Sequence, residues 1–235
     1  MSYVLTAGEK ERFRKALIAA IAIPFIDDIE DYIVESIWAY TKNVHSPDPF
    51  FNIRSKKLFD VTDDNHGIGW SVKSLQWAFN PGCEFELVIQ RAAVYKKAAQ
   101  LGFPGLSSNS EPNMIGKALL EHWKRKVEED AAIQCVRDKR IMVLLKTTNK
   151  EKFSIFEDKL HTYTPNEIKW QWTSADKNGL QGIRKSDGMC VYRWYPSQTQ
   201  FFERFVLPSE AYHFTLKPRR LEIDSVVDML VESLQ

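Results

Sequence analysis

The stretch that most constrains the fold is KLFDVTDDNHGIGWSVKSLQW, residues 57–77. Apolar runs flank a polar turn at 64–67, which is the pattern of a β-hairpin, and we expect strands near 56–62 and 68–78. The second strand is apolar and aromatic, yet it contains a lysine, Lys73. What this ammonium group faces depends on how the two strands pair.

A two-residue turn at 65–66 fixes the pairing of the strands and places Asp60 opposite Ser71, whereas a three-residue loop would shift this register. Opposed residues point to the same side of a sheet, and so do residues two apart on one strand. Asp60, Ser71 and Lys73 therefore share one face, with the carboxylate and the ammonium roughly 5–8 Å apart and within reach of a common ligand. The other face of the second strand carries residues that we expect in the core: Trp70, Val72 and Ser74.

The elements around the hairpin predict an α/β core with a mixed sheet. Helices are expected at 8–22, at 26–42 with Ile29, Ile33, Ile37 and Tyr40 on one face, at 80–102 with Gly102 as its stop, at 114–135, and at 218–234 starting from Pro218. A buried strand is expected at 140–147, and short strands rich in Trp and Tyr at 168–174, 189–195 and 211–217. The segment 80–102 has a competing interpretation, in which residues 85–91 form a strand.

The composition excludes several classes of protein. The chain has 235 residues, 44% of them hydrophobic and 27% charged, as in soluble globular proteins with one large core. No apolar run approaches the roughly 18 residues that span a membrane, and no secretory signal is visible. Three scattered cysteines indicate a reducing compartment, and the histidines show no metal-ligand spacing, with His122 expected on the surface of its helix. We therefore expect an intracellular, cytoplasmic protein.

An aspartate and a lysine on adjacent strands are the groups that metal-dependent phosphodiester hydrolysis uses. A carboxylate such as Asp60 binds a hard cation, here Mg²⁺, which lowers the pKa of a bound water. A lysine such as Lys73 orients that water and offsets the charge that develops on the phosphate. Because one carboxylate holds Mg²⁺ weakly, a second acid is expected nearby.

The spacing from Asp60 through Ser71 to Lys73 resembles the motif of the PD-(D/E)XK nucleases, and the chain is similar in style to a type II restriction endonuclease. Two departures stand out, since Phe59 replaces the proline that often precedes the aspartate and Ser71 replaces a metal-binding acid. One branch of these enzymes lacks that acid and recruits a glutamate about thirteen residues after the lysine. In this chain the residue at that distance is Glu86.

The resemblance implies a restriction-endonuclease-like mixed sheet flanked by helices, within a single domain 1–235. Its catalytic core would span 25–147, and a β-rich recognition elaboration with the closing helix would span 148–235. The implied catalytic residues are Asp60, Ser71, Lys73 and Glu86, of which Asp60 and Glu86 would bind Mg²⁺, and Glu35 of the first core helix is a further candidate acid. The implied partners are double-stranded DNA and a second copy of the chain, because a palindromic target mirrors a two-fold dimer.

Cations and aromatic residues are interleaved in the segment 168–205, although the net charge of the chain is only +1. In KWQW, alternation puts Trp170 and Trp172 on one face, which we expect in the core, and Lys169 and Gln171 on the other. This polar face is either merely solvated or binds DNA, with cations on phosphates and Gln or Arg at base edges. The candidate DNA-binding residues are Lys169, Gln171, Gln181, Arg184, Lys185, Arg193 and Gln198, together with Gln200.

Other interpretations of the hairpin remain open. In the simplest one, Asp60 and Lys73 form a surface ion pair without a catalytic role. The chain could also be a nuclease of the same fold that acts in DNA repair or on structured DNA, or a DNA-binding protein that is inactive because Ser71 replaces an acid. The apolar strand around Lys73, the register and the position of Glu86 favour a site-specific endonuclease that hydrolyses both strands of a DNA duplex.

Overall fold

The computed structural model describes residues 3–44, 57–77, 84–217 and 219–234. The chain forms two compact units, which we call the first and the second unit. The first unit combines residues 1–80, 131–160 and 208–235, and the second combines residues 81–130 and 161–207. Each unit is therefore assembled from separate stretches of chain, and the units do not follow the division at residue 147 that we expect from the sequence.

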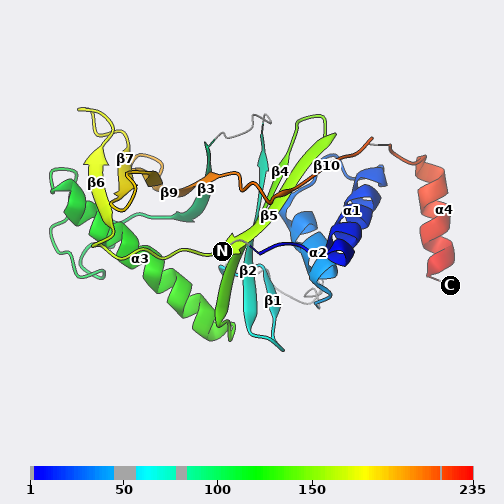
Figure 1. Cartoon of the computed structure of the whole chain (residues 1–235), viewed down its shortest axis with the longest axis horizontal. Coiled ribbons are helices and arrows are strands. Elements are labelled where there is room, and N and C mark those ends of the chain that lie inside the picture. Colours follow the sequence, from blue (N-terminus) through cyan, green and yellow to red (C-terminus); the bar gives the residue numbers. More distant parts are fainter. Residues whose placement is uncertain (1–2, 45–56, 78–83, 218, 235) are drawn as a thin grey trace. The chain divides into compact units, whose positions relative to one another are not determined.

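The first unit contains a five-stranded mixed sheet (Figure 1). Its strands, in spatial order, are β1 (Val61–Asp63), β2 (Ile68–Gln76), β4 (Asp138–Lys146), β5 (Lys152–Lys159) and β10 (Tyr212–Thr215). Strands β2 and β4 are parallel, while the other neighbours are antiparallel. The two parallel strands are joined by a long connection that passes through the second unit, as a crossover between parallel strands requires.

Two helices, α1 (Ala7–Ala22) and α2 (Asp31–Lys42), pack on one face of the first sheet. A capping box between Thr6 and Glu9 begins α1. The core beneath them is aromatic, with the rings of Trp38 and Trp70 edge to face at 6.2 Å. The expected inward face of α2 is confirmed except at Tyr40, which is 54% exposed.

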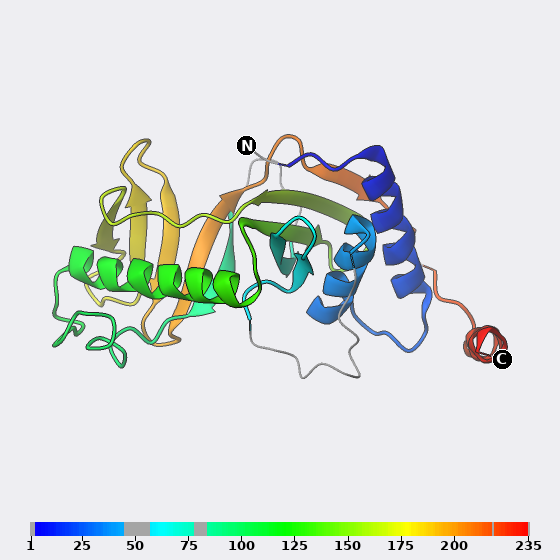
Figure 2. The ribbon, with the colours of Figure 1, turned by 90° about the horizontal axis from the view of Figure 1, so that it is seen from below.

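The second unit contains a five-stranded antiparallel sheet. Its strands, in spatial order, are β3 (Glu84–Arg91), β9 (Gln200–Val206), β8 (Cys190–Tyr195), β7 (Leu180–Arg184) and β6 (Ile168–Trp172). The long helix α3 (Pro112–Ile133) lies along one face of this sheet (Figure 2). The contact is close, because a side chain at Gly116 would collide with the ring of Trp170, and the Asn113 side chain accepts a hydrogen bond from the Trp170 backbone N–H at 2.9 Å.

The helix expected at 80–102 is wrong over residues 84–102, since residues 80–83 lie outside the described ranges, and the competing strand interpretation holds from Glu84 to Arg91. Burial alternates along β3, where Phe85, Leu87 and Ile89 are buried and Val88 is 37% exposed. This period of two decides against a helix that would have placed Phe85 and Val88 together. Residues 94–102 form turns instead, which end at Gly102 with its φ of 87°.

The other expected elements are confirmed. They are the helices α1, α2 and α3, the hairpin of β1 and β2, the buried strand β4, and the short strands β6, β8 and β10. Two of them are shorter than expected, since α2 begins at Asp31 and not at residue 26, and β1 covers only Val61–Asp63. The closing helix α4 runs from Ile223 to Ser233, whereas its expected start at Pro218 lies outside the described residues. The fold is therefore mixed α/β. In the described ranges, no helix has both the length and the apolar character needed to cross a membrane.

Candidate functional site

The hairpin pairs in the register that a two-residue turn predicts. Val61 lies opposite Trp70, and the backbone N–H of Asp60 donates to the Trp70 carbonyl oxygen at 2.9 Å. The turn closes with a hydrogen bond from the Gly67 N–H to the Asp63 carbonyl oxygen at 2.7 Å, and Gly67 has a φ of 66°, a conformation that glycine adopts readily. Asp60 is therefore held opposite Ser71.

A neighbouring segment of the first unit, residues 134–138, holds the hairpin in place. The Gln134 side chain donates to the Phe59 carbonyl oxygen at 2.8 Å and accepts from the Phe59 N–H at 3.4 Å. Close packing adds to this, because a Cβ at Gly69 would lie 2.6 Å from Val136 and 2.8 Å from the Phe59 ring. The residue before Asp60 is thus fixed both by hydrogen bonds and by packing.

The Asp60 carboxylate and the Lys73 ammonium meet on one face of the hairpin. Lys73 Nζ lies 3.7 Å from Asp60 Oδ2, and the two side chains are 26% and 22% exposed. The same carboxylate oxygen accepts the Val72 N–H at 2.8 Å, while Lys73 Nζ also donates to the Val72 carbonyl oxygen at 3.1 Å. The pair is accessible to solvent but oriented by the backbone.

Ser71, on the same face, carries an unusual hydroxyl group. The residue is 1% exposed, and its Oγ makes no hydrogen bond to the part of the protein that the structure describes. A buried polar group without a protein partner is uncommon and calls for a partner from water or a ligand. The face that holds Asp60 and Lys73 therefore also offers an uncommitted hydroxyl.

On the opposite face of β2, Trp70 belongs to a buried charge cluster that the sequence analysis does not find. Trp70 Nε1 donates to Glu157 Oε1 at 2.7 Å, and Glu157 is 1% exposed. Glu157 also pairs with Lys42 at 2.6 Å and with Arg140 at 2.7 Å. The cluster is well satisfied and anchors β2 to α2, β4 and β5, so it supports the hairpin and does not form a second site.

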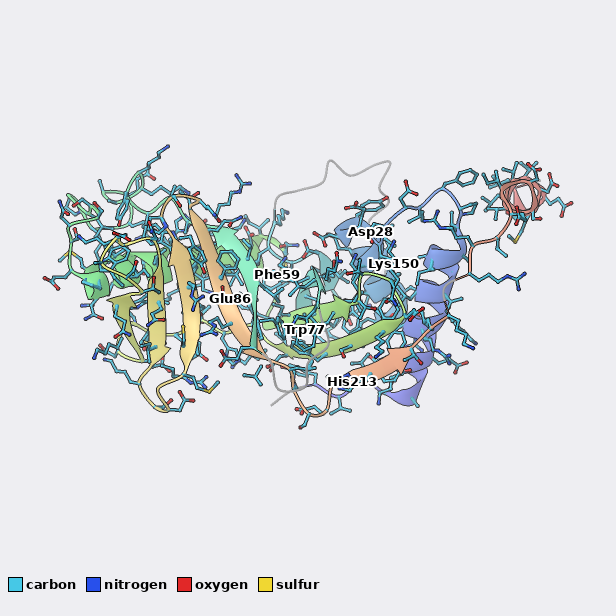
Figure 3. The ribbon with its side chains drawn as sticks, turned by 90° about the horizontal axis from the view of Figure 1, so that it is seen from above. Asp28, Phe59, Trp77, Glu86, Lys150 and His213 are labelled. Carbon is cyan, nitrogen blue, oxygen red and sulfur yellow. The ribbon has the colours of Figure 1, made fainter. Side chains whose placement is uncertain are left out.

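Glu86, the expected second metal ligand, belongs to the second unit. It lies on strand β3 and not on a helix, and Figure 3 shows it on the side of the second sheet away from α3. Its Oε1 lies 3.0 Å from Arg193 NH1 and 3.2 Å from Arg204 Nε. The other candidate acid, Glu35, is half-buried on α2, which packs on the Trp70 face of β2 and thus opposite to the face of Lys73.

Asp60 is the hairpin carboxylate that a cation beside Lys73 would meet. Within residues 3–44, 57–77, 84–217 and 219–234, no group of three or more His, Cys, Asp or Glu side chains gathers in a way that could hold a metal ion. A magnesium ion at Asp60 would need further ligands that the described residues do not bring together.

The second sheet has one face without a covering helix, which we call the open face. Most residues of the other face are buried, with Trp172 and Arg184 half-buried, while those of the open face are mostly half-buried or exposed along all five strands. One row of paired residues crosses the whole open face: Gln171, Gln181, Arg193, Phe202 and Val88. Beside this row lie Lys169, Tyr195, Arg204 and Glu86.

Five of the expected DNA-binding residues lie on the open face, namely Lys169, Gln171, Gln181, Arg193 and Gln200. Arg184 does not join them, because it pairs with Ile168 of the covered face and binds Asp187 and the Tyr163 hydroxyl. The hydrogen bonds that Arg184 donates to Asp187 and then to Tyr163 raise the Arg184 pKa, although burial opposes them. Lys185 and Gln198 lie in exposed turns.

Tyr195, Phe202 and Arg204 are among the open-face residues that are absent from the sequence prediction. The rings of Tyr195 and Phe202 meet edge to face at 5.4 Å, and Arg204 lies opposite Glu86. The alternation in QFFERF carries the signal for Phe202 and Arg204, since it puts both on one side of a strand.

Comparisons of the chain with protein-family models, curated proteins and solved structures found no match. The residues of the hairpin and of the open face are therefore what points to a function.

Proposed function

We propose that this protein is a Mg²⁺-dependent endonuclease that hydrolyses both strands of a specific DNA duplex, in the manner of a type II restriction endonuclease. The observation that carries the proposal is the face shared by Asp60, Ser71 and Lys73. The ion pair lies on strands that pair in the register expected from a two-residue turn, and the buried hydroxyl has no partner in the described protein.

The side chains of this face suit phosphodiester hydrolysis. The Lys73 ammonium can orient an attacking water and offset negative charge as the phosphate becomes five-coordinate. Asp60 holds that ammonium in place, and its fixed position beside β2 makes it the first candidate ligand for a cation. Bound magnesium would supply Lewis acidity to the phosphate. Glu86 as the second ligand remains a prediction, and its pairing with Arg193 and Arg204 gives it another role, argued below.

The fold and the open face support the same proposal. The hairpin is followed by a long connection and a parallel strand, β4, in a mixed sheet with α1 and α2 on one face. This order agrees with the restriction-endonuclease-like arrangement that the resemblance implies, which is part of the proposal. The open face adds cations and amides of the kinds that bind phosphates and base edges. Cleavage of both strands of a palindrome further implies a homodimer.

Incubation of the protein with plasmid DNA and Mg²⁺ tests the proposal. Discrete fragments that vanish when the metal is chelated are expected. Smeared or nicked products would favour a repair or structure-specific nuclease instead. Specific binding without any cleavage would favour the second candidate, an inactive DNA-binding protein, which the serine at position 71 supports because the family has an acid there.

A further inference from the structure

The open face carries a group of four charged side chains from three strands. Glu86 Oε1 lies 3.0 Å from Arg193 NH1 and 3.2 Å from Arg204 Nε, and Glu84 pairs with Arg204 NH2. Arg193 belongs to β8 and Glu86 to β3, with β9 between them. The Arg193 side chain therefore extends over β9, across a distance of roughly 10 Å between the outer strands. We call Glu84, Glu86, Arg193 and Arg204 the charge quartet.

The quartet leaves its arginines incompletely satisfied. Both guanidinium groups approach the same oxygen of Glu86, although a guanidinium binds an anion best as a two-pronged fork. The Nε atoms of Arg193 and Arg204 are buried and make no hydrogen bond within the described protein. Exposed fractions of 27% for Arg193, 20% for Arg204 and 21% for Glu86 leave the quartet within reach of a ligand.

The surroundings of the quartet indicate which ligand that would be. Arg193 donates to the Tyr195 hydroxyl at 3.3 Å, and Tyr195 packs against Phe202 on the same face. Gln181 lies directly opposite Arg193, and Gln171 lies opposite Gln181. Cations beside aromatic rings and amides are the combination that nucleic-acid surfaces use, with phosphates on the cations and bases on the rings and amides.

We propose that Glu84 and Glu86 act as internal substitutes for phosphate groups, occupying Arg193 and Arg204 until the backbone of a DNA duplex displaces them. The choice of duplex DNA as the ligand rests on the proposed function. Because every bound phosphate must first break an internal ion pair, the two carboxylates weaken sequence-independent binding. Contacts to bases are not opposed in this way, so they supply a larger share of the binding free energy that remains.

Binding of the full-length protein to a random-sequence duplex, measured without metal, tests this inference. We expect Glu84→Gln with Glu86→Gln to tighten binding about three- to tenfold, since each exposed ion pair removed contributes a modest factor. The dependence of log K on log salt should also become steeper, because two more cations are free to displace counterions. Glu129→Gln with Glu151→Gln, which removes two charges at exposed positions outside the quartet, is the matched control and should have little effect.

A second pair of variants guards against an effect of net charge or folding. In a background of Arg193→Gln with Arg204→Gln, the Glu86→Gln change should tighten binding no more than Glu129→Gln does. Unchanged or weaker binding by the Glu84→Gln, Glu86→Gln protein would overturn the inference. So would a Glu86→Gln protein that loses cleavage in Mg²⁺ with no change in metal-free binding, since Glu86 would then be a metal ligand. Tighter binding in a protein that cuts no DNA would instead support the quartet and refute only the nuclease.

Discussion

The two sheets of this protein differ in how many of their faces are buried. In the first sheet the central strand β4 is buried on both sides, with every residue from Ile141 to Leu145 at most 1% exposed. In the second sheet α3 covers one side, while the open face keeps polar and aromatic side chains accessible on all five strands. In a sheet buried on both sides, functional side chains are accessible mainly at an edge such as the hairpin. A sheet that is covered on one side exposes a wide surface on the other.

Because of this difference, the two regions are suited to different tasks. The hairpin has few functional groups, each fixed by packing and hydrogen bonds, as positioning for catalysis requires. The open face has many groups, each half-exposed and each able to contribute a little to binding. Substitutions around the hairpin should therefore have large effects on stability or cleavage, and those on the open face should have smaller effects on affinity.

The largest effect on stability is expected at Glu157, beneath the hairpin. Glu157→Gln would leave Lys42 and Arg140 without their shared buried partner, and loss of one member of a buried pair costs about 3–5 kcal/mol. We expect the lower end of that range, because Glu9 and Asp138 still pair with the two cations. Urea unfolding followed by circular dichroism measures the loss. The exposed Glu151→Gln serves as the control, and equal stabilities of the two variants would contradict the account.

A smaller loss is expected at Gly69, where the hairpin packs against Val136 and Phe59. Gly69→Ala would force both side chains to move, at a cost of about 1–3 kcal/mol. Because Phe59 precedes Asp60, the displacement should also reduce cleavage. Gly8→Ala in α1 is a matched control, since its Cβ meets only Arg12 at 3.5 Å, and it should be neutral or slightly stabilising. A Gly69→Ala protein as stable and active as the wild type would show that the hairpin is not held by this packing.

On the open face, the expected effects are on DNA affinity and not on stability. Gln171→Ala should reduce discrimination between the target and other sequences by about 1–3 kcal/mol, as for one base contact. Lys169→Ala should instead weaken binding to all sequences alike and lower the salt slope by about one. Gel-shift titrations at several salt concentrations separate the two outcomes. Arg184→Ala is the control, because Arg184 is bound to Asp187 away from the open face. Loss of discrimination in that variant would show that the DNA-binding surface lies elsewhere.

The smallest effect concerns His122, on α3 of the second unit. Burial, and then the nearby cations Lys97 and Arg125, lower the pKa of His122 to about 4. An unfolded histidine titrates near 6.5, so between pH 6.5 and 4 the unfolded state binds more protons than the folded state. The contribution of His122 to stability is therefore unchanged above about pH 6.5 and becomes unfavourable as the pH falls toward 4. Thermal melts at pH 7.5 and 4.5 measure this effect. The melting temperature of His122→Gln should decrease less between these two pH values than that of the wild type, and equal decreases would contradict the assignment.

Local patterns in the sequence predict much of the hairpin and of the open face. The turn at 65–66 determines which residues of β1 and β2 pair, and alternation in KWQW separates Trp170 from Lys169. A helix is expected at 80–102 because the alanine- and lysine-rich stretch after Arg91 favours one. The expectation fails because pairing with the distant β9 makes residues 84–91 a strand. The same distant pairing brings Glu86 to Arg204, which no local pattern reveals.

Contacts between residues far apart in the chain also explain why the sequence does not predict the division into units or the role of Glu157. The interleaving of the two units depends on contacts between stretches far apart in the chain, so a division by residue number cannot capture it. Glu157 is one of two acids in β5, and only its contacts with Lys42 and Arg140 show that it is a buried partner of these cations.

The central claim is that the hairpin cleaves DNA and the open face binds it. Lys73→Ala tests this most directly, with cleavage in Mg²⁺ and metal-free DNA binding measured on the same preparation and with the exposed Lys152→Ala as a control. We expect cleavage by Lys73→Ala to fall by about 10²–10⁴, the usual cost of losing such a group, while DNA affinity stays within about twofold of the wild type. Cleavage within about tenfold of the wild type, or a parallel loss of binding, would contradict the claim.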